Sequence, residues 1–465
     1  MVVNIKEMLC DNSLIYKYRS MDSLLKFEEL EKNYIHFSPF SELNDPLDGY
    51  INIEFEGDKI LWTNFFKNYI FSFFAFYGYV KINIEYNFIK RMPKEFEENF
   101  LINTGFIHDV IEKQDDLKKQ CYKLLNSNLV QTIIEDLEAR VDPIYYDELY
   151  EYLTKIHDCI VKNDAIAIPK EDKRAYFKSS QSVESVKLIQ AHMIRSSING
   201  IDLMSSYYFF PKHYMDNLGQ LMYEIPYVSS FSKDPLSLPM WGYYANSSKG
   251  VCLIFKTTKN DNNVDVLYLS ESPKSVLNGR PVNKEAYHFT KVDYKDSLSK
   301  ISFFKFLGTR PRKEVIDYWY KFNEIVSPKV YDIYKDLKQY RKDYWEKWDN
   351  IINTKIKDWE HEKEYRIFKV DTISDYTYNN KRLNDSVIKE NRRLYYDIDS
   401  LDGVIFGINT SGEDMNKIIS MLVKKMKLSK TKSELNIFVV KYVGSSGKID
   451  LKQLGFIDNS SFHPV

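Results

Sequence analysis

The alternation of hydrophobic and polar residues near the N-terminus predicts the order strand, helix, strand. Residues 14–19 have the aromatic and β-branched content that is typical of a strand. A short helix follows, for which Asp22 or Ser23 provides the N-cap. Residues 34–37 form the second strand, which Pro39 ends.

Further along the chain, helical and strand-like patterns alternate in long blocks. Strand-like runs are nearly absent from 85–215 and return at 227–232 and 250–255, and a second helical, highly charged stretch covers 295–358. Residues 412–427 have the pattern of a helix. We therefore predict an α+β fold, with a discontinuous strand-rich core and two helical insertions. The predicted parts are residues 1–84, the first part of the core; 85–215, a helical insertion lobe; 216–294, core strands; 295–358, a charged helical insertion; and 359–465, the last part of the core.

Composition limits the classes of function. The chain has 465 residues, of which 44% are hydrophobic and 28% charged, as expected of a globular protein with more than one compact region. A formal net charge of −1 provides no overall attraction for nucleic acid. The four cysteines (Cys10, Cys121, Cys159 and Cys252) and the eight histidines are dispersed, so we predict neither a metal site nor a disulfide framework.

The sequence also argues against a membrane location. The N-terminal residues lack the apolar core of a signal peptide. The run at 69–80 is apolar and aromatic, but it is shorter than the roughly 18–20 residues that a membrane-spanning helix needs. We interpret it as a buried segment, and we expect a cytoplasmic protein with no membrane partner.

The most informative stretch is Trp359–Phe368. If it is a strand, side chains alternate between faces, so Glu362, Glu364 and Arg366 lie together on one face. Two carboxylates and a guanidinium are costly to bury without partners, which favours a polar ligand-binding cleft. The alternative is a helix on which Glu360 and Glu364 belong to a solvated face.

Three other segments of the predicted core carry polar or aromatic residues that core packing does not require. Two basic residues occupy one face of the first strand, an Asn-Asp-Pro turn is acidic, and a Ser-Phe-Ser strand precedes an aromatic stretch. The candidate residues are Lys17 and Arg19; Asn44, Asp45 and Asp48; Ser230 and Ser232; and Trp241 and Tyr244.

These segments, in this order, resemble a mainly bacterial family, domain-of-unknown-function family 2971. Its members have a Tyr-Lys-Tyr-Arg start, an Asn-Asp-Pro turn, a Ser-Phe-Ser, a Trp-x-x-Tyr-Ala stretch and a Glu-x-Glu-x-Arg strand. The matching segments here are residues 16–19, 43–46, 230–232, 241–250 and 359–366.

The layout also resembles the ADP-ribosyltransferase superfamily, which implies an ADP-ribosyltransferase-like core and NAD as substrate. The resemblance implies that Arg19 or Lys17 contacts NAD and that Ser230 and Ser232 support the nicotinamide-ribose pocket. It implies catalysis by Glu364, with Glu362 as the first Glu of the motif. The chain departs from the pattern at Phe231, where relatives have Thr, and at Lys17, where many have His.

The residue types suit this chemistry. A carboxylate at Glu364 can stabilise the oxocarbenium-like sugar formed when the nicotinamide–ribose bond breaks, and Glu362 can orient or deprotonate the nucleophile. Lys17 and Arg19 would hold the pyrophosphate, Trp241 or Tyr244 would stack on a ring, and Arg366 would line the cofactor site.

Three functions follow as hypotheses. The first is an NAD-consuming effector, either an ADP-ribosyltransferase or an NAD glycohydrolase, acting as a bacterial toxin or in anti-phage defence. Its partners are NAD or another nucleotide, and the acceptor stays open between water, protein and nucleic acid. The second is a non-catalytic nucleotide-sensing or interaction module, and the third is a metal-dependent nuclease built on Asp45, Asp48, Glu362 and Glu364.

Overall fold

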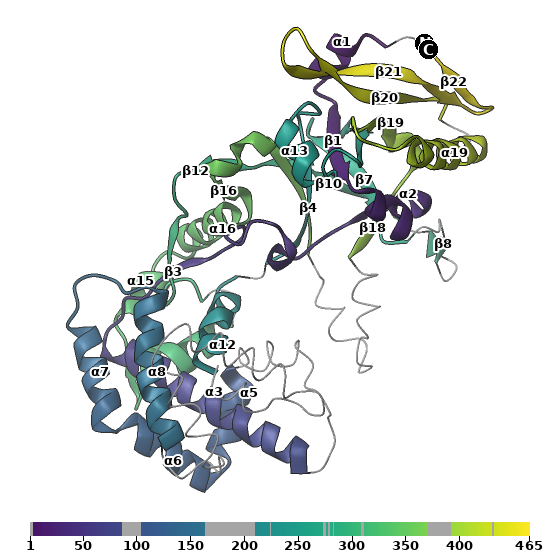
Figure 1. Cartoon of the computed structure of the whole chain (residues 1–465). Coiled ribbons are helices and arrows are strands. Elements are labelled where there is room, and N and C mark those ends of the chain that lie inside the picture. Colours follow the sequence, from purple (N-terminus) through teal and green to yellow (C-terminus); the bar gives the residue numbers. More distant parts are fainter. Residues whose placement is uncertain are drawn as a thin grey trace. The chain divides into compact units, whose positions relative to one another are not determined.

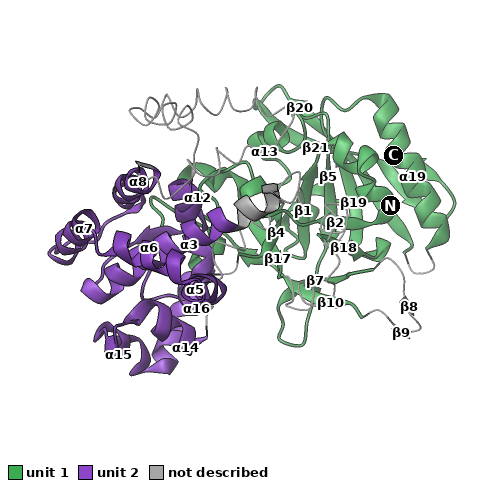
Figure 2. Ribbon diagram, turned by 90° about the horizontal axis from the view of Figure 1, so that it is seen from below, with its two compact units in different colours: residues 1–50, 225–298, 350–465 green, residues 51–224, 299–349 purple. Residues whose placement is uncertain are grey.

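The chain forms two compact units, which Figure 2 shows in different colours. Unit 1 comprises residues 1–50, 225–298 and 350–465, and unit 2 comprises residues 51–224 and 299–349. The computed structural model describes residues 3–85, 104–162, 210–223, 225–272, 276–277, 280–281, 283–307, 311–370, 392–429 and 432–465.

Unit 1 is built on a nine-stranded sheet in the order β11-β17-β4-β1-β5-β19-β20-β21-β22. Figure 1 labels several of these strands, among them β1, β4 and β20. Neighbouring strands are antiparallel except β19 and β20, which are parallel. The strands are β1 (Leu14–Arg19), β4 (Tyr227–Ser232), β5 (Val251–Lys256), β11 (Thr290–Lys291), β17 (Glu364–Lys369), β19 (Leu401–Phe406), β20 (Glu434–Val443), β21 (Lys448–Asp458) and β22 (Phe462–Pro464).

A smaller sheet and several short elements complete unit 1. The smaller sheet has the order β10-β7-β18-β2, with β6 paired to β7, while β12 pairs with β16 and β8 with β9. These strands are β2 (Tyr34–His36), β6 (Thr258–Lys259), β7 (Asp265–Ser270), β8 (Val276–Leu277), β9 (Arg280–Pro281), β10 (Glu285–His288), β12 (Asp293–Lys295), β16 (Thr354–Ile356) and β18 (Arg393–Tyr396). The helical segments are α1 (Ile5–Cys10), η1 (Asp22–Lys26), α2 (Glu29–Lys32), η2 (Phe40–Glu42), α13 (Leu238–Tyr243), η5 (Lys357–Glu362), η6 (Ile398–Ser400) and α19 (Gly412–Leu428).

Alternation along β1 separates two hydrophobic clusters on the two faces of the large sheet. Ile15 belongs to a cluster that includes Phe231 and Ile367 of the same sheet, residues of the smaller sheet, and α19. Tyr16 and Tyr18 belong to the other cluster, which α13 covers with Met240 and Trp241. Because successive side chains of a strand point to opposite faces, this assignment also fixes the faces of the polar residues of β1.

Unit 2 is mainly helical in its described residues. The long helix α3 contacts α5, α6, α7 and η4, and buried aromatic rings dominate its core, including Trp62, Phe65 and Trp319. The helical segments are α3 (Lys59–Glu85), α5 (Thr104–Glu112), α6 (Asp115–Leu125), α7 (Asn128–Glu138), α8 (Tyr146–Lys162), α12 (Phe210–Asn217), η3 (Leu218–Leu221), α14 (Arg312–Val315), η4 (Ile316–Tyr320), α15 (Lys329–Tyr334) and α16 (Leu337–Asn353), whose residues from Asn350 onward belong to unit 1. The short strands are β3 (Asn52–Glu54), β13 (Lys300–Ser302), β14 (Lys321–Phe322) and β15 (Ile325–Val326).

The prediction of a mixed α+β protein is confirmed, and the predicted strands near residues 14, 34, 227 and 250 all form. The boundaries between compact units differ from the predicted ones. The first falls after Tyr50 rather than after residue 84, because α3 packs its aromatic side chains against the helices of unit 2. Residues from Asn350 onward belong to unit 1, and 295–358 contains short strands as well as helices. Residues 86–103 and 163–209 of the predicted helical lobe lie outside the described residues.

The aromatic run at 69–80 lies within α3. Its side chains from Tyr69 to Phe76 are buried, in agreement with the interpretation as a buried segment. None of the helices in the described part of the chain combines the length and apolar character required to cross a lipid bilayer.

Candidate functional site

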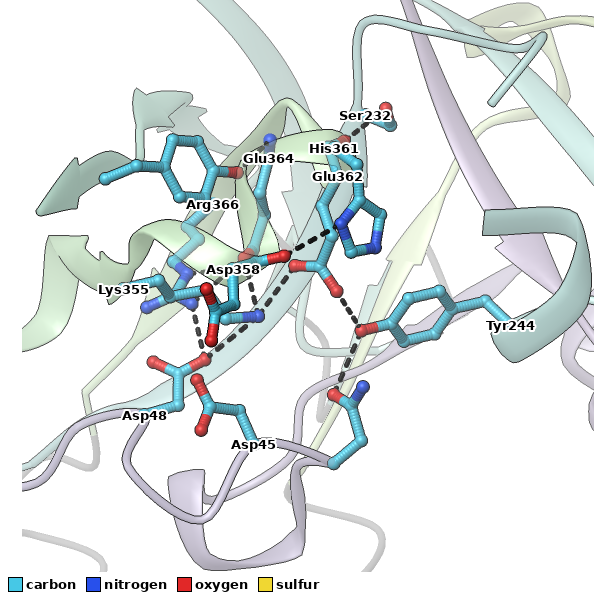
Figure 3. Close-up of polar contacts among 12 residues, drawn as sticks. Asp45, Asp48, Ser232, Tyr244, Lys355, Asp358, His361, Glu362, Glu364 and Arg366 are labelled. Carbon is cyan, nitrogen blue, oxygen red and sulfur yellow. Dashed lines mark hydrogen bonds and ion pairs between the residues drawn. The ribbon is translucent and has the colours of Figure 1, made fainter. Parts of the chain in front are cut away.

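A buried network of charged side chains lies in unit 1, centred on Arg366 (Figure 3). The guanidinium of Arg366 is fully buried and donates to both carboxylate oxygens of Glu364, at 2.8 and 3.0 Å. It also donates to Asp48 Oδ2 at 2.6 Å and to the carbonyl oxygen of Ile352 at 2.6 Å. Pairing of this kind offsets the cost of removing the guanidinium from water.

Lys355 is the second cation of the network. Its ammonium donates to Glu362 Oε2 at 2.6 Å and lies 3.3 Å from Glu364 Oε2 and 3.5 Å from Asp48 Oδ2. The five charged residues, three carboxylates and two cations, are each at most 5% exposed. Lys355 therefore links Glu362, which has no described contact with Arg366, to the rest of the network.

Strand pairing positions these side chains. In the register of β17 with β4, Glu364 lies opposite Ser232 and Arg366 opposite Ser230. Lys355 is positioned by another pair of strands, since the parallel pairing of β12 with β16 places it opposite Tyr294. The hydroxyl of Tyr294 in turn accepts a hydrogen bond from the backbone N–H of Glu364, at 2.9 Å.

The prediction that Glu362, Glu364 and Arg366 lie on one strand is correct for Glu364 and Arg366 and wrong for Glu362. Glu362 ends the 3₁₀ helix η5, and Lys363 has a left-handed φ of 46°, so the chain turns before β17 begins. The alternative of a solvated helix also fails, because both Glu362 and Glu364 are buried. Side-chain alternation therefore does not bring Glu362 to the network; the turn and Lys355 do.

The two predicted serines stabilise the acidic segment. Ser232 Oγ is fully buried and donates to the backbone carbonyl of Glu362 at 2.7 Å, and it accepts from the N–H of Asp234 at 3.1 Å. Ser230 hydrogen-bonds Glu364 and so helps to lower the pKa of that carboxyl. Both serines lie near the carboxylates, but Ser232 fixes the backbone at Glu362 and does not line an open pocket.

Tyr244 of the aromatic stretch and Asn44 of the acidic turn lie at the Glu362 end of the network. The Tyr244 hydroxyl hydrogen-bonds Glu362 Oε1 and lies 2.9 Å from Asn44 Oδ1. Asp48 reaches Arg366 and Lys355, as described above. Asp45 has a local role, because its Oδ1 accepts from the N–H of Leu47 at 2.9 Å, which closes the turn. Asp45 Oδ2 is buried with no hydrogen-bond partner among the described residues.

The prediction that Lys17 and Arg19 share the cleft with Glu364 is contradicted by the register of the sheet. Tyr16 is opposite Ser232, and Ser232 is opposite Glu364, so the even-numbered residues of β1 face the network. Lys17 points to the other face, where its ammonium donates to Ser229 Oγ at 2.7 Å and lies 4.5 Å from the centre of the Phe231 ring. Burial, followed by the charge of Arg19, lowers the pKa of Lys17 to about 7. Arg19 is paired with Glu29 of α2, at 2.6 Å from Nε to Oε2.

The structure places Trp241, one of the two residues predicted to stack on a ligand ring, in the core of unit 1. Its indole is 1% exposed, packs edge-on against Tyr18 with ring centres 5.1 Å apart, and donates to the carbonyl of Pro235 at 2.9 Å. A side chain that fills the core in this way has no free face for a ligand. Tyr244 acts through its hydroxyl, as described above.

The network contains three carboxyl groups but only two cations, and the pKa values of the carboxyl groups are shifted in different directions. Burial alone would raise the pKa of Glu364, but Arg366 and Lys355 outweigh it and bring the value to about 2. Burial raises the pKa of Asp48 and of Glu362, and the nearby cations offset this only in part. Burial opposes the charge of Lys355, but Glu364, Glu362 and Asp48 together raise its pKa. Glu364 is thus the anion of the network, whereas Asp48 and Glu362 accept protons more readily.

This arrangement predicts how the stability of unit 1 depends on pH. Because Asp48 and Glu362 have raised pKa values, the stability they contribute is present below their unfolded values, near 4, and is lost as the pH rises through the folded values. Glu364 has a lowered pKa, so its contribution is present above about 4.3 and is lost as the pH falls toward 2. We expect Asp48→Asn to make the loss of stability with rising pH, from about pH 4 upward, shallower than in the wild type.

Hydrogen-exchange protection of the β17 amides, corrected for the intrinsic pH dependence of exchange, measures this effect. Asp265→Asn, which changes a carboxylate paired with Lys259 outside the network, is the control and should leave the profile unchanged. A profile of Asp48→Asn identical to that of the wild type would contradict the assignment.

Two residues of the site were missed by the sequence interpretation, Lys355 and Tyr294. Both were assigned to other segments, Lys355 to the charged insertion and Tyr294 to the end of the core. A local signal existed for Lys355, since it lies between the β-branched residues Thr354 and Ile356 in a strand-like run. Nothing local indicated that this run pairs with β12.

The described residues contain no group of three or more His, Cys, Asp or Glu side chains arranged to hold a metal ion. Asp48, Glu362 and Glu364 are paired with cations instead, and Asp45 has no described contact with them. The nuclease hypothesis therefore gains no support from the geometry.

Comparison with known families supports one of the two resemblances. A family model described as "Protein of unknown function (DUF2971)" matches residues 240–367. The match includes the Trp-x-x-Tyr-Ala stretch and the Glu-x-Glu-x-Arg segment, whereas the segments at 16–19, 43–46 and 230–232 lie outside it. Neither the curated proteins nor the solved structures gave a match to this chain.

Proposed function

We propose that unit 1 is an ADP-ribosyltransferase-like enzyme that breaks the nicotinamide–ribose bond of NAD. The observation that carries this proposal is the pairing of β17 with β4, which brings Glu364 opposite Ser232. The resemblance to ADP-ribosyltransferases attaches function to three segments that lie far apart in the sequence: the first strand, the Ser-x-Ser strand and the Glu strand. In this protein the Ser-x-Ser strand and the Glu strand are hydrogen-bonded neighbours in one sheet, as a shared site requires. The first strand also pairs with β4, but its basic residues lie on the other face.

Glu364 has the electrostatic properties that the reaction needs. Bond breakage places positive charge on the ribose, and a carboxylate that is already ionised stabilises this charge without further rearrangement. Arg366 and Lys355 keep Glu364 ionised at neutral pH, since they bring its pKa to about 2. Substrate access requires Glu364 to exchange part of its contact with these cations for contact with the ribose.

Glu362 is suited to the acceptor side of the reaction. In the proposed step, nicotinamide leaves with the electron pair of the C–N bond, the acceptor oxygen or nitrogen bonds C1′ of the ribose, and Glu362 takes the acceptor's proton. The raised pKa of Glu362 and its hydrogen bond to Tyr244 favour this role. Lys17 and Arg19 have no part in the proposal, because their side chains lie on the other face of the sheet.

The test is incubation of the purified full chain with NAD, followed by chromatography for free nicotinamide. We expect release that depends on protein concentration, with water as acceptor or with added protein or nucleic acid. No release under any of these conditions would contradict an NAD-consuming activity. A role as a bacterial toxin or in anti-phage defence is proposed by analogy with this chemistry alone.

One observation favours a second candidate, a non-catalytic nucleotide-sensing module. Lys355 and Arg366 already pair with Asp48, Glu362 and Glu364, so the network is stable without a reacting partner. Binding of NAD measured by calorimetry, without release of nicotinamide, would identify this candidate.

A further inference from the structure

Three aromatic rings meet at the edge of the charged network. Tyr243 of α13 and Trp359 and His361 of η5 have ring centres 6.0–6.4 Å apart in all three pairs. Tyr243 is 68% exposed, and the other two side chains are partly buried. We call Tyr243, Trp359 and His361 the aromatic cluster.

Packing of the core does not account for the aromatic cluster. The side chains of α13 that contact the hydrophobic cluster are Met240 and Trp241, and Tyr243 points away from it. A single exposed aromatic residue is ordinary on a protein surface. Three aromatic rings in mutual contact, beside a buried charged network, form a surface on which a planar ring can stack.

The aromatic cluster is joined directly to the network. Lys355 Nζ lies 5.0 Å from the centre of the Trp359 ring and contacts Glu362 and Glu364 with the same ammonium. Tyr243 and His361 immediately precede Tyr244 and Glu362, which are hydrogen-bonded to each other. A ring held by the cluster would therefore lie next to the Glu362 end of the network.

His361 provides a polar group for such a ring. Its Nδ1 lies 3.0 Å from the carbonyl oxygen of Asp358, so Nδ1 carries the proton and Nε2 is an acceptor. Nε2 is buried and has no hydrogen-bond partner within the described part of the chain. A buried acceptor without a donor is costly, and an amino group on a bound ring would satisfy it. The ring centre of Tyr243 lies 6.4 Å from that of His361, and the largely exposed side chain of Tyr243 can change rotamer.

The charges around the cluster do not favour a polyanion. The exposed residues of η5 carry both signs, Lys357 against Asp358 and Glu360. We propose that Tyr243, Trp359 and His361 form a stacking subsite for an amino-bearing heteroaromatic ring of a nucleotide. The identity of the nucleotide rests on the proposed function: NAD contains adenine, which bears an exocyclic amine, and nicotinamide, whose carboxamide NH2 can donate a hydrogen bond in the same way.

Calorimetry of the full chain with nicotinamide mononucleotide and with adenosine monophosphate tests the subsite. We expect at least one probe to bind, and Tyr243→Ala to weaken that binding about tenfold. Tyr243→Phe should retain it, because the ring is kept. Tyr331→Ala in unit 2 is the matched control, since Tyr331 is a similarly exposed tyrosine, at 71%. The probe that binds identifies which ring occupies the subsite.

Binding of neither probe, or equal affinity in Tyr243→Ala and wild type, would overturn the subsite. Nicotinamide release from NAD, measured on the same preparations, separates this result from the proposed function. If the wild type releases nicotinamide, and Tyr243→Ala has the same affinity for the probes and the same KM for NAD, the subsite is excluded but the proposed function is not. Ring binding that depends on Tyr243, without any nicotinamide release, would support the subsite and remove the enzyme proposal.

Discussion

Replacement of Glu364 by glutamine is expected to slow nicotinamide release by about a hundredfold or more while NAD remains bound. The amide is nearly isosteric with the carboxylate and can still accept hydrogen bonds, but it carries no charge to stabilise the developing positive charge on the ribose. Wild-type Glu364 is ionised, since its pKa is about 2, so the substitution removes a full charge at neutral pH. Steady-state release of nicotinamide and NAD affinity by calorimetry measure the two effects separately.

The same substitution also removes a partner of the buried Arg366, so it requires a control for lost stability. Asp48→Asn provides one, because Asp48 also accepts from Arg366, at 2.6 Å, and approaches Lys355 at 3.5 Å. Both variants leave the cations of the network with one fewer carboxylate. If their hydrogen-exchange protection falls similarly but only Glu364→Gln loses most turnover, the loss is chemical. Equal turnover in Glu364→Gln and the wild type would exclude the assigned role.

Lys355→Met is expected to lower the local stability of β17 and β4 by about 3–5 kcal/mol at neutral pH. Removal of one buried cation leaves Asp48, Glu362 and Glu364 with Arg366 alone, and Glu362 with no cation in described contact. The carboxylates then carry uncompensated charge in a buried site, which is far more costly than loss of the pair itself. Acidification should restore part of the loss, because protonation of Glu362 and Asp48 removes that charge.

Hydrogen exchange of the β17 and β4 amides reports this local free energy without assuming that the two units unfold together. Lys363→Met is the matched control in the same segment, since Lys363 pairs with Asp234 at 2.7 Å but is 60% exposed in its side chain. An exposed pair contributes little, so we expect an effect below about 1 kcal/mol. Similar effects of the two lysine substitutions would show that Lys355 does not hold the network together.

The local pattern of hydrophobic and polar residues was sufficient to predict much of the secondary structure. Residues 14–19, 227–232 and 412–427 were predicted as strand, strand and helix, and they form β1, β4 and most of α19. Each has a strong period of hydrophobic positions or a clear cap, and both signals act between residues close in sequence. The sequence pattern also identified Glu364, Arg366 and Ser232 as polar residues on core strands, where their burial requires partners.

Long-range pairing decided which of the candidate residues meet. Alternation along β1 puts Lys17 and Arg19 on one face and Tyr16 and Tyr18 on the other, but it does not say which face meets Glu364. The register of β1 with β4 and of β4 with β17 settles that choice, and it turns both basic residues away from the network.

By itself, then, the sequence determined many of the segments that become strands and helices, and it indicated that the strand at 364–369 carries charge, because propensity, capping and periodicity act locally. Only the tertiary structure decided the composition of the site. Lys355 reaches it through the parallel pairing of β16 with β12, and Glu362 reaches it through the turn at Lys363. Tyr243 and His361 meet across two elements that lie far apart in the chain. Pairing between distant strands depends on the packing of whole faces, which no local window of the sequence contains.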